Sequence, residues 1–153
     1  MGVMPSKQTI IVAVAIVFIG IQFIPVDQSN PPVTAQAEAQ TPSNVKVILK
    51  RSCYDCHSNE THWPWYSRIA PMSWLVTHDV QDGREHMNFS TWATLPPNEL
   101  VEKMEEVWEE VEEGEMPLWF YLPMHPEARL SDEDRAVLRS WATSGNRSET
   151  HGD

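Results

Sequence analysis

The chain has 153 residues and a formal net charge of -11, with 12 prolines, 7 tryptophans and 2 cysteines. This length suits one compact domain with additional segments, because most single domains contain roughly 50 to 200 residues. The acidic balance argues against a nucleic-acid partner, which requires a basic face, and two cysteines within one short motif exclude a disulfide framework.

Residues 10–24 are apolar except for Gln22, and the only charged residue before them is Lys7. This pattern predicts an export signal, and we expect a transmembrane anchor over 10–24 rather than a cleaved signal peptide. The small residues Ala35-Gln36-Ala37 lie too far beyond the apolar run for a cleavage site. Because no Lys or Arg follows until Lys46, residues 1–9 are expected in the cytoplasm of a bacterium and the remainder in the periplasm. Cleavage would instead release an exported soluble protein.

Residues 25–44 are rich in Pro, Ala, Gln, Ser and Thr and predict a linker. After Ser43 as a candidate cap, Val45, Ile48 and Leu49 recur at helical spacing, which predicts a short helix that ends in the cysteine motif. Prolines and Gly83 punctuate residues 62–97, which leaves room for one helix over 73–82 between long loops.

Two amphipathic helices are predicted in the last third of the chain. Asn98 caps the first, which Gly114 ends, and its apolar stripe consists of Leu100, Met104, Val107 and Val111. Ser131 and Asp134 form a capping box for the second helix, which is expected to end before Gly145. The composition predicts a flexible tail over 144–153.

The sequence Cys53-Tyr54-Asp55-Cys56-His57 has the spacing of a c-type haem attachment motif. Residues three and four apart share one helix face, so both thiols and the imidazole can meet one macrocycle. We therefore expect one covalent haem c, with thioether bonds from Cys53 and Cys56 and with His57 as an iron ligand. A zinc site would need further paired ligands, and a redox dithiol would need neither His57 nor export.

Several further stretches resemble the bacterial haem-binding domain family of monohaem c-type cytochromes, in which a tryptophan-rich segment follows the attachment motif. The resemblance implies haem binding and an exported location without defining a reaction. It covers nearly all of residues 30–142 through Asn30-Pro31-Pro32-Val33, the attachment motif with Ser58-Asn59-Glu60-Thr61, Trp63-Pro64-Trp65-Tyr66-Ser67, Ile69-Ala70-Pro71, Gly83-Arg84, Asn88-Phe89-Ser90, Met116-Pro117, His125-Pro126 and Trp141.

Met116 is the predicted second iron ligand, because it lies in a loop between the last two helices, after Gly114 and before the rigid Pro117. His78, His86 and His125 are the alternatives, followed by an open iron. Core packing is the competing role for a methionine.

Aromatic and basic side chains near the motif complete the predicted site. Trp63, Trp65 and Tyr66 are expected to wall the porphyrin, although core packing explains such a cluster equally well. Arg68 and Arg84 are candidates to pair with the haem propionates, or else to bridge nearby acids.

The expected architecture is mainly α: a small cytochrome c-like haem domain with long loops over 45–143, behind an N-terminal transmembrane helix. The expected function is electron transfer to an unidentified redox protein, without enzymatic turnover. A haem-based peroxidase, a gas or redox sensor with open iron, and a structural haem subunit of a membrane complex are the alternatives.

Overall fold

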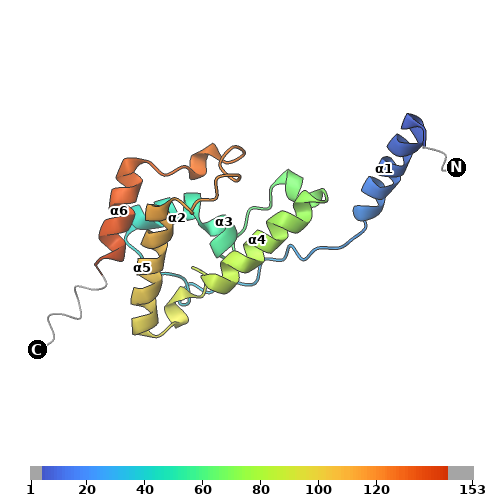
Figure 1. Ribbon diagram of the computed structural model, residues 1–153. Helices are drawn as coiled ribbons and strands as arrows, with labels where there is room; N and C mark the ends of the chain where they lie inside the picture. Colours follow the sequence, from blue (N-terminus) through green and yellow to red (C-terminus); the bar gives the residue numbers. More distant parts are fainter. Residues whose placement is uncertain (1–4, 145–153) are drawn as a thin grey trace, which may run out of the picture.

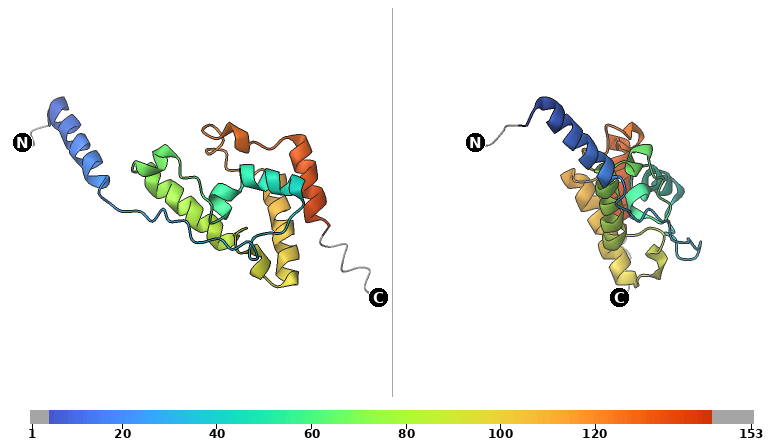
Figure 2. Two further views of the ribbon diagram at one scale, coloured as in Figure 1. Left: turned by 180° about the vertical axis from the view of Figure 1, so that it is seen from behind. Right: turned by 90° about the vertical axis from the view of Figure 1, so that its right-hand side faces the viewer.

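The computed structural model describes residues 5–144 and contains six α-helices within them. No strand occurs in this range, so the prediction of a mainly α fold is confirmed there. The haem motif and the last two helices pack together at one end, and α1 projects from the other (Figures 1 and 2). Three 3-10 helices separate the longer elements: Trp65–Arg68 (η1), Trp92–Thr94 (η2) and Pro126–Ala128 (η3).

The prediction of an N-terminal transmembrane helix is wrong. Helix α1 spans Lys7–Ile21, and over residues 5–144 the structure contains no helix whose length and apolar character suffice to cross a bilayer. Its 15 residues extend about 22 Å, whereas the hydrocarbon core measures about 30 Å. The apolar run 10–24 extends three residues beyond the end of the helix, because Gln22 is the C-terminal cap and Phe23 and Ile24 follow outside the helix.

The residues predicted as a linker contact the domain at several points. The Gln28 side-chain amide donates to the carbonyl of Ser67, and the buried Ala39 donates its backbone N–H to the carbonyl of Phe89 over 2.8 Å. We call residues 22–40 the strap. It runs without helix or strand from α1 to the helices around the haem motif (Figure 2).

Three helices carry the middle of the chain. Helix α2 spans Ser43–Ser52 and ends at Cys53, where φ of -127° leaves the helical region, and α3 is the single turn Tyr54–His57. Helix α4 spans Met72–His86 and is longer than the predicted 73–82, because Gly83 continues the helix instead of ending it.

The last two helices follow the sequence pattern except at the start of the first of them, where the predicted cap Asn98 lies inside the helix and Pro96 precedes it. Helix α5 spans Pro97–Glu113 and ends at Gly114, whose φ of 80° is left-handed. Helix α6 spans Asp132–Ala142, and its predicted capping box between Ser131 and Asp134 is present. The predicted tail beyond residue 144 lies outside the described residues.

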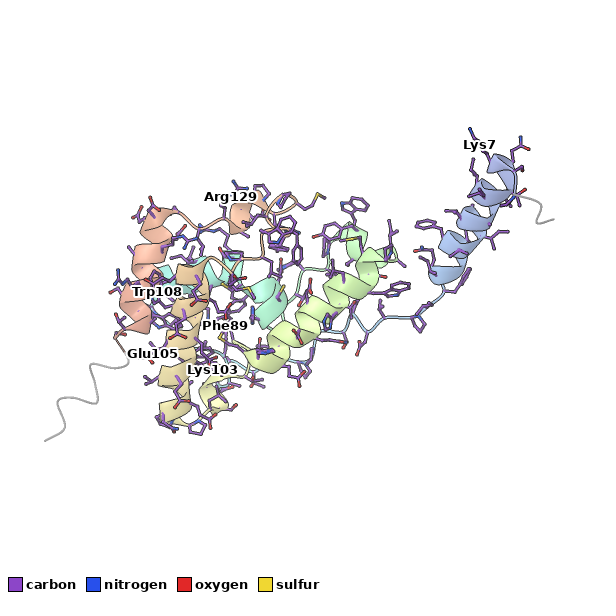
Figure 3. All side chains as sticks on the ribbon, viewed as in Figure 1. Lys7, Phe89, Lys103, Glu105, Trp108 and Arg129 are labelled. Atoms are coloured by element: carbon purple, nitrogen blue, oxygen red, sulfur yellow. The ribbon has the colours of Figure 1, made fainter. Side chains whose placement is uncertain are left out.

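The core is built on a stack of aromatic rings centred on Phe89. Its ring lies parallel to Tyr54 at 5.3 Å between centroids and stacks on Trp92 at 5.2 Å, and Trp92 in turn contacts Trp141 of α6. Phe89 is fully buried between α3, α4 and α5 (Figure 3). The stack therefore joins the haem motif to the C-terminal helix.

Replacing Phe89 with Ala should lower the free energy of unfolding by about 3 to 5 kcal/mol, because truncating a buried aromatic side chain leaves a cavity. Denaturant titration followed by circular dichroism measures this loss. Val47→Ala on α2 is the matched control, since Val47 is 63% exposed and its truncation should change stability little. Equal effects of the two substitutions would show that the stack is not the core of the fold.

Candidate functional site

The predicted attachment motif forms one tight turn. The N–H groups of Cys56 and His57 both donate to the carbonyl of Cys53, at 3.2 and 2.9 Å. The break at Cys53 turns this residue and α3 away from the axis of α2. As the spacing predicts, both cysteines and His57 line one cavity.

The orientation of His57 is set by α4. Its Nδ1 lies 2.9 Å from the carbonyl oxygen of Gly83 and 3.2 Å from that of Met87. Because carbonyl oxygens only accept, Nδ1 carries the proton and Nε2 keeps its lone pair. Burial also lowers the pKa of His57, against the raising effect of these two hydrogen bonds, so the ring is neutral as a metal ligand must be.

Helix α4 passes unusually close to the motif at Gly83. A Cβ atom placed on this glycine would lie 2.9 Å from the backbone oxygen of Cys56 and 3.3 Å from its Cβ. Only glycine therefore allows the approach that brings its own carbonyl to His57. The structure thus gives a packing reason for the glycine of Gly83-Arg84, one of the stretches that resemble the haem-binding domain family.

The two cysteines are free and half-buried. Burial raises the pKa of both thiols to about 12, assisted at Cys53 by Cys56 and at Cys56 by Asp55 and Asp79. Redox-active dithiols have lowered thiol pKa values instead. The environment therefore disfavours the dithiol alternative.

A cavity of about 720 Å³ lies in front of the motif and is bounded by α3, α4, α5 and the loop after α5. Cofactor sites commonly measure about 300 to 1,000 Å³, so its size suits the expected haem. Ser52 also lines the cavity, beside Cys53. The cavity's apolar walls include Met87, Phe89, Val107, Val111, Pro117, Leu118 and Phe120.

Met116 lines the same cavity as His57. The left-handed Gly114 turns the chain at the end of α5, and the N–H groups of Glu115 and Met116 both donate to the carbonyl of Glu110. This C-terminal cap fixes the start of the loop and holds Met116 at the cavity wall.

The alternative histidine ligands lie in different places. His86 also lines the cavity, whereas His78 and His125 do not. His125 is held elsewhere, with Nε2 at 2.8 Å from the hydroxyl of Tyr66 and its ring stacked on Tyr121 at 4.0 Å. Within residues 5–144 no group of three or more His, Cys, Asp or Glu side chains is placed to hold a metal ion.

The predicted aromatic wall is only partly at the motif. Trp65 and Tyr66 line a second cavity of about 270 Å³, whereas Trp63 lines neither cavity. The two cavities share wall residues, namely Asp55, Cys56, Asp79, Leu118, Phe120 and Tyr121. The aromatic residues therefore adjoin the larger cavity from the side of Cys56.

The predicted propionate partners lie outside both cavities. Arg68 is exposed. The Arg84 guanidinium donates to the carbonyls of Ser58 and Ser29, at 2.7 and 2.9 Å, and to the side chains of Asn30 and Thr61. Arg84 therefore ties the strap to the turn after the motif.

Sequence reasoning missed a clasp between the motif and the loop after α5. The Tyr121 hydroxyl donates to Asp55 Oδ2 over 2.8 Å, and both residues line the larger cavity. The second carboxylate oxygen of Asp55 accepts from the backbone N–H of His62. The position of Asp55 inside the motif was visible in the sequence, but nothing there marked Tyr121 as its partner.

Comparison with known proteins agrees with this geometry. The profile of a family described as "Haem-binding domain" matches residues 16–144. Neither the curated proteins nor the solved structures gave a match.

Gly83→Ala should lower the free energy of unfolding by about 1 to 3 kcal/mol, because α4 must move away from the Cys56 backbone. Gly20→Ala is the matched control: a Cβ there meets nothing within 4 Å, and alanine favours the helix. Thermal unfolding of both variants measures the loss of stability. Binding of Ni²⁺ ions at His57 measures whether the imidazole still lies at the cavity. A Gly83→Ala variant as stable as Gly20→Ala would contradict the close contact.

Proposed function

The chain belongs to the haem-binding domain family, and we propose that it is a monohaem c-type cytochrome that transfers electrons. The observation that carries the proposal is the meeting of Cys53, Cys56 and a neutral, oriented His57 on one cavity of about 720 Å³. Bound haem supplies an iron that changes reversibly between the ferric and ferrous states.

In this proposal the residues of the turn have different roles in holding the haem. Cys53 and Cys56 would hold the haem through thioether bonds, and His57 would offer Nε2 to the iron while the carbonyl of Gly83 accepts from Nδ1. This hydrogen bond keeps the ring from rotating away from the cavity. The clasp between Tyr121 and Asp55 keeps the following loop closed over the same cavity.

Met116 is the proposed second iron ligand. It shares the cavity with His57, and the cap at Gly114 holds it there. Closed coordination by His and Met suits electron transfer, because no position is open for a substrate. His86 is the remaining histidine alternative.

The proposed redox partner is a basic protein. Acidic side chains dominate the charged lining of the cavity, and Lys103 there is already paired with Glu106 at 2.6 Å. With a net charge of -11, the protein attracts a cationic partner over distances of about a Debye length. The acids are Asp55, Asp79, Asp82, Glu106, Glu109 and Glu110.

We also propose that the haem domain works in the bacterial periplasm and that the N-terminal segment contacts the cytoplasmic membrane. Lys7 is the only charged residue of α1, and its apolar side chains are exposed. A lipid surface would cover side chains that water solvates poorly.

Covalent attachment predicts that haem stays on the chain in denaturing electrophoresis after expression with a c-type maturation system. Replacing Cys53 and Cys56 together with Ser should abolish haem staining of the band, because no thioether can form. Ser140→Ala, on the exposed surface of α6, should leave the staining unchanged. Covalent haem in the double variant would refute the proposal.

Met116→Ala should remove the weak near-infrared band of ferric His–Met iron and open the ferrous iron to carbon monoxide. Met87→Ala is the matched control, because Met87 lines the same cavity and contacts His57 through its backbone, which alanine retains. Denaturant unfolding of both variants separates loss of a ligand from loss of packing, which costs about 2 to 5 kcal/mol for a buried methionine. A folded Met116→Ala protein with an unchanged ferric spectrum would assign the ligand elsewhere.

A further inference from the structure

One end of the molecule exposes large apolar side chains from two segments far apart in the sequence. Trp65 is 69% exposed and Trp119 is 79% exposed, although tryptophan is usually well buried. We call this set the apolar face. It comprises Trp65, Ile69, Met72, Leu75, Trp119, Phe120 and Met124.

Six of the seven residues of the apolar face are joined to one another. Trp65 of η1, Met72 and Leu75 of α4, and Phe120 and Met124 of the loop after α5 line the same cavity of about 270 Å³. Trp119 packs edge-on against Phe120, with 5.7 Å between ring centroids. Contiguous exposed apolar surface of this kind marks a contact with another protein or with a membrane.

The strap brings α1 to this face. The backbone N–H of Ala70 donates to Gln22 Oε1 over 2.9 Å, and Gln22 Nε2 donates to the carbonyl of Ala70 over 3.2 Å. Ala70 lies between Ile69 and Met72, so α1 leaves the domain at the apolar face (Figure 1). None of the α1 residues is buried, and Ile11, Ile16 and Val17 are each more than 60% exposed.

Charged side chains are scarce near the apolar face and concentrated at the opposite end of the molecule. Helix α1, residues 65–75 and residues 117–124 together contain only Lys7 and Arg68 as Lys, Arg, Asp or Glu side chains. Helix α5 alone carries eight glutamates, and it lies at the end of the molecule away from α1 (Figures 1 and 2). An acidic protein that rests on the apolar face would keep its acidic helix in water.

We infer that the apolar face rests on a lipid surface, with Trp65 and Trp119 among the lipid headgroups. Tryptophan is enriched at this depth of a membrane because its ring is amphipathic. Residues 65–75 and 117–124 contain no Asp or Glu, and the exposed Arg68 suits phosphate headgroups. A basic redox protein would instead bind the acidic side chains around the larger cavity. The inference rests on the proposed membrane contact of the N-terminal segment and fixes the orientation of the domain.

The test uses the full-length haem-loaded protein and phosphatidylcholine vesicles. Vesicles should slow the hydrogen–deuterium exchange of backbone amides by about tenfold over residues 65–75 and 118–124. The exchange rates over α5 should change little. Trp65→Ser and Trp119→Ser together should weaken vesicle partitioning by about tenfold or more, whereas the exposed Val47→Ser on α2 should not change it.

Two outcomes would overturn the inference. Vesicle-bound protein with unchanged exchange over these residues would mean that α1 alone contacts lipid. Slowing that appears without vesicles as the protein concentration rises would assign the face to a second copy of the chain. Neither readout depends on how haem is attached, so failure here would leave the proposed cytochrome function standing.

Discussion

The close approach of α4 to the turn of α3 at Gly83 is the contact on which the rest of the site depends. It brings a backbone carbonyl within 2.9 Å of His57 Nδ1 and leaves Nε2 for the cavity. One such hydrogen bond contributes only about 0.5 to 1.5 kcal/mol to folding. Its importance is geometric, because the absence of a side chain at residue 83 decides the spacing of the two helices and the tautomer of the histidine together.

Features that depend on neighbours in the sequence could be predicted. The capping box of α6 and the end of α5 at Gly114 follow from short-range rules, and the placement of Cys53, Cys56 and His57 on one cavity follows from their spacing. The transmembrane prediction failed because the helix ends at Ile21, before the apolar run does, and its 15 residues extend only about 22 Å. Gly83 was read as a helix breaker because its close neighbour in space could not be seen.

Long-range partners could not be predicted from the sequence. Tyr121 and Asp55 are 66 residues apart, and Arg84 and Ser29 are 55 apart, so no local pattern links them. The sequence makes Arg84 a candidate to pair with the propionates or with nearby acids, because arginine commonly pairs with carboxylates. In the structure its guanidinium donates to four protein acceptors, two of them on the strap.

The same guanidinium defines where the folding unit begins. Arg84 binds Ser29 and Asn30 on the strap and Ser58 and Thr61 beside the motif, so trimming the chain to its first packed helix would remove two acceptors at once. Those N–H groups would then need water or new partners within a few residues of His57. An extended stretch without regular secondary structure is therefore held against the domain by the same side chain that borders the motif, and a fragment that starts after Asn30 would lose both contacts.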